Sequence, residues 1–242
     1  MPRGFALSEE QTTDRLASTV IDLIQPGMVV GLGSGRTAKR GIAALARRVK
    51  EGLSVHCVST SEDSEQFARA HGLKCIEFAN VERVNFLFDG ADEVDGEMRM
   101  LKGAGGAMTR ERMVAWASER RVYMVQDYKI VETLGTRSAL AVAVMAFGLA
   151  SVRAYLRQIG LNGVMRRTMK GDYFITDNGN LIIDVTIGTF DVEDLAVSLN
   201  AIPGVIDHGL FLREADEIFV ESESDIRHLV RDELGEAAER TA

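Results

Sequence analysis

The sequence predicts an α/β fold in which a smaller α+β domain is inserted into a larger one. In residues 1–134, short apolar runs alternate with amphipathic stretches, which is the pattern of a mostly parallel sheet with helices on both faces. A glycine turn at residues 33–37 follows an apolar run. From residue 135 the order of elements changes to βαββαβ. We therefore expect a domain with an open, mostly parallel sheet at residues 1–134 and 208–242, and a ferredoxin-like domain at residues 135–207.

The large domain is expected to begin with a helix. Ser8 and Gln11 have the spacing of a capping box, and Gln-Pro-Gly at residues 25–27 ends the helix.

Trp116 lies on the apolar stripe of a later helix and is expected in the core. The chain from Arg231 onward is expected to be a solvated helix or a frayed tail. The other elements are strands at residues 28–32, 53–59, 74–78, 84–88 and 121–125, and helices at residues 38–49, 62–71 and 106–120.

The small domain contains two amphipathic stretches, at residues 149–159 and 192–199, that predict helices. Residues 177–180, Asp-Asn-Gly-Asn, have the composition of a hairpin turn. Strands are expected at residues 140–145, 165–168, 173–176, 181–185 and 205–206, and returns to the large domain at residues 210–211 and 217–220.

The composition narrows the class of protein. A net charge of −8 and a pI near 5.1 argue against general binding to nucleic acid or to a membrane surface. Cys57 and Cys75 lie in apolar runs without C-x-x-C spacing and are expected as reduced core residues. The beginning of the chain lacks the apolar region of a signal peptide, and no run is apolar enough to cross a bilayer. We expect a soluble cytoplasmic protein.

The glycine turn is a candidate phosphate site. Gly33, Ser34, Gly35, Arg36 and Thr37 stand between a strand and a helix, where backbone N–H groups at a helix N-terminus bind anions. The Gly-Lys-Ser/Thr ending of a P-loop is missing. A dinucleotide fingerprint would need glycine where Arg36 stands. The pattern therefore favours a phosphate monoester over NAD, although a purely structural turn would also use these glycines.

A second candidate site runs from residue 88 to residue 111. Four acids come first, at Asp89, Asp92, Glu93 and Asp95, and they are followed by Lys102, a glycine loop and Glu111 near the start of a helix. Strand, acidic turn, glycine loop and helix are the parts from which an open α/β sheet builds a site at its carboxyl edge. Such a concentration of charge is typical of functional sites.

These side chains suit the isomerisation of a sugar phosphate. Moving a carbonyl between C1 and C2 needs a base for a carbon-bound proton, donors for an enediolate oxygen, and an acid/base that opens the sugar ring. Glu111 suits the base, and Lys102 supplies a cation. Asp89 and Asp92 are candidates for ring opening and hydroxyl contact. The N–H groups of the loop, including those of Gly103 and Gly105, are candidate donors, and paired acids that bind Mg²⁺ are the alternative reading.

Several motifs resemble those of the ribose-5-phosphate isomerase type A family, and the resemblance extends to about residue 230. The motifs are residues 33–37 (Gly-Ser-Gly-Arg-Thr), 88–93 (Phe-Asp-Gly-Ala-Asp-Glu), 102–107 (Lys-Gly-Ala-Gly-Gly-Ala), 109–111 (Thr-Arg-Glu), 176–180 (Thr-Asp-Asn-Gly-Asn), 202–205 (Ile-Pro-Gly-Val) and 209–211 (Gly-Leu-Phe).

The resemblance implies a Rossmann-like catalytic domain with a ferredoxin-like lobe, no cofactor, and a homodimer or homotetramer. It implies Glu111 as the proton-shuttling base, with Lys102 beside the reacting oxygens. Asp89 would open the sugar ring, and Asp92 would lie in the same pocket. Thr37 and Lys129 match positions that contact phosphate and substrate. The implied reaction interconverts ribose 5-phosphate and ribulose 5-phosphate through a cis-enediolate, in the non-oxidative pentose phosphate pathway.

The departures from the family pattern gather at the expected phosphate pocket. Arg36 stands where the family has serine, Thr13 where a lysine is common, and Tyr128 replaces a serine before Lys129. We expect Arg36 to bind the phosphate in place of the lysine that is missing at Thr13. The alternatives are a solvated Arg36 and an altered substrate.

Three other functions stay open. One keeps the chemistry but acts on a different aldose or aldose phosphate. Another is a non-catalytic sugar-phosphate sensor, because similar folds bind effectors. A CoA-transferase-like enzyme would use a glutamate as its nucleophile, but the sequence shows no CoA site. No metal site is expected, because the histidines at positions 56, 71, 208 and 228 share no ligand spacing.

Overall fold

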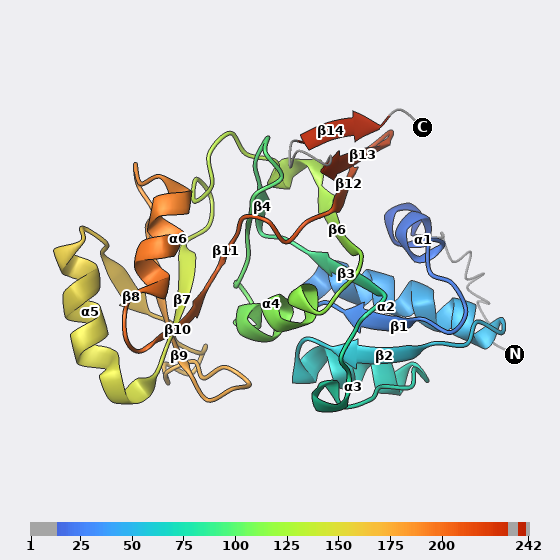
Figure 1. The fold of residues 1–242 in the computed structure, drawn as a ribbon, viewed down its shortest axis with the longest axis horizontal. Coiled ribbons are helices and arrows are strands. Elements are labelled where there is room, and N and C mark those ends of the chain that lie inside the picture. Colours follow the sequence, from blue (N-terminus) through green and yellow to red (C-terminus); the bar gives the residue numbers. More distant parts are fainter. Residues whose placement is uncertain (1–13, 232–236, 241–242) are drawn as a thin grey trace, which may run out of the picture.

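The computed structural model describes residues 14–231 and 237–240, and its large sheet has the strand order β14-β13-β12-β6-β3-β1-β2 (Figure 1). From β12 to β2 neighbouring strands are parallel, whereas β13 and β14 join antiparallel. The strands are β1 (Val29–Leu32), β2 (His56–Ser59), β3 (Phe86–Gly90), β6 (Arg121–Gln126), β12 (Glu217–Glu221), β13 (Ile226–Arg231) and β14 (Ala237–Arg240).

Helices cover both faces of this sheet. On one face, Phe86 and Phe88 pack in a single apolar cluster with residues of α1 (Arg15–Ile21), α2 (Gly35–Lys50) and α3 (Glu62–Ala70). On the other face, Leu87 packs against α4 (Met108–Trp116). Because β3 is buried on both faces, all of its residues are apolar except Asp89 and the glycine that follows it.

The second lobe, at the left of Figure 1, is a sheet in the order β10-β7-β9-β8 with two helices. All of its strand pairs are antiparallel, and the chain order βαββαβ with this strand order is the ferredoxin-like arrangement. The predicted α/β class with a Rossmann-like sheet and a ferredoxin-like lobe is confirmed. The second lobe comprises β7 (Leu140–Val144), α5 (Leu149–Gln158), β8 (Gly163–Met165), β9 (Leu181–Val185), α6 (Val192–Asn200) and β10 (Val205–His208).

A three-stranded sheet, in the order β11-β5-β4, lies between the two larger ones in space (Figure 1). It comprises β4 (Glu93–Val94), β5 (Met100–Leu101) and β11 (Leu210–Phe211). Short 3₁₀ helices occur at η1 (Phe78–Asn80), η2 (Asp127–Lys129) and η3 (Ala146–Gly148). The predicted domain boundaries at 134/135 and 207/208 stay a prediction.

The chain crosses between the lobes twice, and a charged side chain binds each crossing segment. These side chains are Glu93, which follows Asp92 in the sequence, and Arg112, which follows Glu111. Glu93 is fully buried and accepts hydrogen bonds from the backbone N–H groups of Gly135, Arg137 and Ser138. On the return crossing, Arg112 pairs with Asp207 and donates to the carbonyls of residues 208 and 210. The crossings are therefore held by the residues next in sequence to Asp92 and Glu111.

His208 lies in the return crossing and is expected to make the protein sensitive to acid. Its Nδ1 accepts the Leu210 N–H, which fixes the proton on Nε2, and the ring is only 3% exposed. Burial, with Arg112 nearby, lowers the pKa of His208 to about 4 from 6.5. Between pH 6.5 and about pH 4, His208 is therefore protonated in the unfolded chain but neutral in the native state. The free energy of unfolding consequently decreases as the pH falls through this range.

Urea unfolding at about pH 7 and about pH 4.5 measures this effect, and from the shift we expect His208 to account for a loss of about 2 to 3 kcal/mol. His208→Asn keeps a neutral acceptor for the Leu210 N–H and should remove that part of the loss. Equal pH dependence in the two proteins would show that His208 is not the acid-sensitive group.

Several predicted elements are wrong in detail. Residues 74–78 form only one β-bridge, between Cys75 and Cys57, because the chain turns into η1. Residues 173–176 likewise form isolated bridges instead of a strand. The predicted helix or frayed tail after Arg231 contains β14, which pairs with the exposed edge of β13, where charged residues are tolerated.

The predicted burial of Trp116 is also wrong. The α4 helix ends at Trp116, before the expected residue 120. Trp116 is 90% exposed. The helix buries Met108, Glu111 and Val114, a stripe at helical spacing from which Trp116 points away. The two cysteines are buried and unpaired, as predicted. The capping box at Ser8 and the departure at Thr13 lie outside the described residues.

Candidate active site

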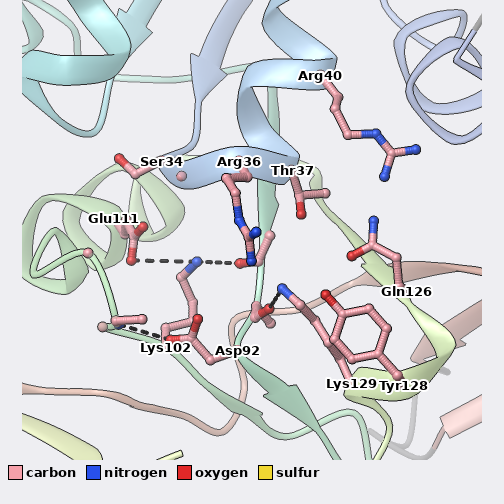
Figure 2. Close-up of a pocket in the computed structure, with 16 residues that line it drawn as sticks. Ser34, Arg36, Thr37, Arg40, Asp92, Lys102, Glu111, Gln126, Tyr128 and Lys129 are labelled. Carbon is pink, nitrogen blue, oxygen red and sulfur yellow. Dashed lines mark hydrogen bonds and ion pairs between the residues drawn. The ribbon is translucent and has the colours of Figure 1, made fainter.

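A cavity of about 440 Å³ opens where β1, β3 and β6 end, at the carboxyl edge of the parallel strands (Figure 2). Its walls combine the glycine turn, the acidic turn, the lysine–glycine loop and the end of β6. The lining residues are Ser34, Gly35, Arg36, Thr37, Arg40, Gly90, Ala91, Asp92, Lys102, Gly103, Ala104, Gly105, Glu111, Gln126, Tyr128 and Lys129.

The glycine turn is shaped by two glycines with different tasks. Gly35, the first residue of α2, has φ +85°, a conformation that disfavours other residues. Gly33 allows a close approach, because a Cβ there would lie 2.1 Å from an Asp89 oxygen. That approach lets the Ser34 N–H donate to Asp89 at 3.0 Å. The turn is thereby fastened to the acidic turn beside it.

Positive charge gathers on one side of the cavity. Figure 2 shows the Arg36 side chain extending from the start of α2 into the cavity, with Lys129 and Tyr128 along the wall. Arg36 is exposed and forms no hydrogen bond or ion pair with any described residue. Burial lowers the pKa of Lys129, and the charges of Lys102 and Arg36 add to this effect. An anion between these cations would relieve their repulsion.

Lys102 is a buried ammonium, 4% exposed, on the floor of the cavity. Its Nζ lies 2.9 Å from Asp89 Oδ2 and also donates to the Gly90 carbonyl. Burial opposes the charged form, but the carboxylates of Asp89 and Glu111 outweigh it and raise the pKa of Lys102. Lys102 therefore stays protonated at neutral pH.

Glu111 is a buried carboxyl group, 5% exposed, in the first turn of α4. Its Oε2 lies 3.5 Å from Lys102 Nζ and accepts no shorter hydrogen bond from the described residues. Burial raises the pKa of Glu111 above its ordinary value, and the charge of Lys102 opposes this rise. Oε2 of this basic carboxylate is thus buried without a hydrogen-bond donor in the described part of the chain, and the residue lines the cavity.

The lysine–glycine loop supplies N–H groups at the same place. Gly103 and Gly106 have φ of +108° and +76°, so both positions favour glycine. Ala104 N–H donates to Asp92 Oδ2 at 2.9 Å. Asp92 is partly exposed and lines the cavity, whereas Asp89 is fully buried beneath it.

The structure brings most of the predicted site residues to one cavity. Asp89 and Gly33 do not line it; both lie behind the wall, and Asp89 contacts the lining residues Lys102 and Ser34. Sequence reasoning missed Arg40 and Gln126 as lining residues. Arg40 follows Arg36 by one helical turn, which was an available signal. Gln126 is the last residue of β6 and carried no comparable signal.

Two further features concern the described part of the chain alone. In residues 14–231 and 237–240, no group of three or more His, Cys, Asp or Glu side chains is placed to hold a metal ion. No helix in the same ranges has both the length and the apolar character needed to cross a membrane.

Comparisons with known sequences point to one family. The family model described as ribose 5-phosphate isomerase A (phosphoriboisomerase A) matches residues 56–225. The chain is 40% identical over 227 residues to the ribose-5-phosphate isomerase A of Thermomicrobium roseum, and the match covers 93% of this chain and 96% of that one. It is 40% identical over 215 residues to the ribose-5-phosphate isomerase A of Gluconobacter oxydans, and the match covers 88% of this chain and 93% of that one.

Solved structures agree with the sequences. The ribose 5-phosphate isomerase A of Methanocaldococcus jannaschii superposes with a TM-score of 0.85 at 32% identity, covering 89% of this chain and 96% of that one. A D-ribose-5-phosphate isomerase in complex with phospho-erythronic acid superposes with a TM-score of 0.86 at 29% identity, covering 91% and 99%. The motifs, the fold and these comparisons lead to one conclusion: the chain belongs to the ribose-5-phosphate isomerase A family.

Proposed function

We propose that the protein interconverts D-ribose 5-phosphate and D-ribulose 5-phosphate through a cis-enediolate. The observation that carries the proposal is the buried pair formed by Glu111 and Lys102, 3.5 Å apart on the floor of a cavity whose opposite wall is cationic. The relatives matched by sequence and by structure are named for the same reaction. One of them was solved with a phosphorylated sugar acid, which supports a sugar phosphate as the ligand here.

Glu111 is proposed as the base. With the open-chain aldose bound, its carboxylate takes the proton from C2, and the electron pair moves to O1 to give the enediolate. A proton then passes between O2 and O1, and Glu111 returns its proton to C1, which leaves the carbonyl at C2. The raised pKa of Glu111 supports this role, because a stronger base removes a carbon-bound proton more readily.

Lys102 and the loop are proposed to stabilise the enediolate. The Lys102 ammonium and the N–H groups of Gly103 and Gly105 are donors at the cavity surface, where negative charge on an oxygen is favoured. Asp92 is the better candidate for ring opening, because it is partly exposed in the cavity. Burial of Asp89 supports a different role for that residue, the orientation of Lys102.

The phosphate is proposed to bind between the glycine turn (Ser34, Gly35, Thr37) and the cations Arg36 and Lys129. Both cations line the cavity, and Arg36 has no acidic partner among the described residues. A guanidinium donates two parallel hydrogen bonds to a phosphate, which a lysine does not. The expected contribution of Arg36 is therefore to affinity.

Replacing Arg36 by Ser is expected to raise KM for ribose 5-phosphate by about 10-fold to 100-fold with little change in kcat, because charge-assisted hydrogen bonds are removed while the reacting carbons are untouched. Initial rates over a range of substrate concentrations measure both constants. Arg47→Ser, an exposed position in the last turn of the same helix, is the control. If Arg36→Ser keeps the original KM, Arg36 is a solvated side chain that binds no phosphate.

The substrate is tested by a panel of sugars. Purified protein treated with a chelator is incubated with ribose 5-phosphate, arabinose 5-phosphate or ribose, and ketose formation is followed. We expect the protein to turn over ribose 5-phosphate but little unphosphorylated ribose, because ribose lacks the phosphate that the cationic wall would bind. Turnover of another sugar alone would favour altered specificity, and binding without turnover would favour a sensor.

We also propose that the protein is a homo-oligomer and that it is cytoplasmic. A homodimer or homotetramer is supported by large apolar side chains exposed in the small lobe, among them Phe147 and Met169. A cytoplasmic location is the setting that this metabolic reaction suggests. Neither affects the residues assigned to the chemistry.

A further inference from the structure

We propose that Arg166, a residue of the small lobe, is a positioning residue for the isomerisation. It orients two peptide groups of the lysine–glycine loop, so that the Ala104 N–H reaches Asp92 and the Gly105 N–H faces the reacting oxygens. The inference rests on the function proposed above for the cavity. It gives the small lobe a part in the chemistry that the cavity-lining residues alone do not reveal.

Arg166 binds two loop carbonyls with a single nitrogen. Its Nη1 donates to the Gly103 oxygen at 2.7 Å and to the Ala104 oxygen at 3.0 Å. The rest of the guanidinium is held by Asp184 on β9, which accepts from Nε at 2.9 Å and also from Nη2. The Arg166 and Asp184 side chains are only 15% and 20% exposed, so this ion pair is mostly buried.

The two carbonyls determine where the N–H groups point. The described chain has no cis peptide bond, and in a trans peptide the C=O and the following N–H point in opposite directions. Carbonyls of Gly103 and Ala104 drawn towards Arg166 therefore turn the N–H groups of Ala104 and Gly105 away from it. The Ala104 N–H reaches Asp92, a lining residue, which fixes that direction as the cavity side.

The Gly105 N–H remains as a donor. Gly105 lines the cavity, and its N–H donates to no acceptor within the described part of the chain. Arg166 places a positive charge on the carbonyl end of the same peptide, which polarises the N–H further. A donor prepared in this way favours an oxyanion more than a neutral carbonyl.

The small lobe also supports the loop by packing. A Cβ on Gly106 would lie 2.5 Å from the Phe174 ring, so the loop rests directly on that side chain. The Arg166 guanidinium lies 5.8 Å from the centroid of the same ring. Loop, aromatic ring and guanidinium thus form one contact between the lobes, and removal of Arg166 would release the peptide groups rather than unfold the loop.

The test compares Arg166→Met with Arg167→Met. Arg167 is the adjacent residue; it donates to the Gly171 carbonyl and lies over the Tyr173 ring, but it makes no contact with the loop. For Arg166→Met we expect kcat with ribose 5-phosphate to fall about 100-fold, because donors are misplaced at the enediolate. We expect KM and inhibition by inorganic phosphate to stay at the values of the control, since the phosphate wall is untouched.

Two milder variants keep the inference testable if Arg166→Met does not fold. Arg166→Lys retains a donor for one carbonyl, and Asp184→Asn weakens the hold on the guanidinium; each should lose part of kcat, with thermal melting like that of Arg167→Met. A folded Arg166 variant that retains the kcat of the control would overturn the inference. Failure of the unaltered protein to isomerise ribose 5-phosphate would refute the proposed function instead.

Discussion

Replacing Glu111 by Gln is expected to lower kcat for ribose 5-phosphate by about 10⁴-fold, the upper end of what a general base contributes. The amide keeps the shape of the buried side chain but cannot accept a carbon-bound proton. Calorimetric titration should show ribose 5-phosphate binding with little change, because the phosphate wall lies on other elements. Glu119→Gln, an exposed position beyond the end of α4, is the matched control.

The pH dependence gives an independent check on the same residue. A base must be ionised, so kcat/KM should rise with pH, and burial places this rise above the ordinary glutamate pKa of 4.5. A Glu111→Gln variant that retains the kcat of the Glu119 control would assign the base to another group. A rise in kcat/KM confined to the ordinary glutamate range would contradict the buried, more basic carboxylate.

Replacing Lys102 by Met is expected to lower kcat about 10³-fold, because a preorganised cation at the developing oxyanion is removed. It should also destabilise the fold by about 3 to 5 kcal/mol, since Asp89 and Glu111 are left buried without their cation. Both effects are measured, by kinetics and by urea unfolding. Lys39→Met, which breaks a largely exposed pair with Asp63, should change neither by much.

A double variant separates chemistry from stability. Adding Asp89→Asn to Lys102→Met removes one unpaired carboxylate, so part of the stability should return. The decrease in kcat should remain, because no cation is restored. Recovery of kcat together with stability would mean that Lys102 acts only in the fold and not at the substrate.

Sequence reasoning reached the parts of the site that are close together in the chain. Lys102 and Glu111 are nine positions apart on one loop and helix, and their residue types indicate the chemistry. The assignment of Asp89 and Asp92 to one pocket was only half supported by the geometry: they share a turn, yet one is buried and the other lines the cavity. Burial depends on tertiary packing, which spacing does not specify.

The remaining features depend on contacts between distant segments. Arg166 meets the loop across more than sixty positions, at Gly103 and Ala104, and no local pattern marks such a contact. Trp116 was misjudged because periodicity gives the spacing of a stripe but not which stripe faces the sheet. The strand at Ala237–Arg240 has a charged composition, and only the open edge of β13 makes it a strand.

In the proposed reaction, the Glu111 carboxylate breaks the C2–H bond of ribose 5-phosphate. Ribose 5-phosphate labelled with deuterium at C2 tests this step, with NMR used to follow cleavage of the C2–D bond by the unaltered protein and by Glu111→Gln. We expect the unaltered protein to cleave this bond with a primary isotope effect, and the variant to bind the sugar but leave the bond intact. Cleavage at equal rates by the two proteins would contradict this step.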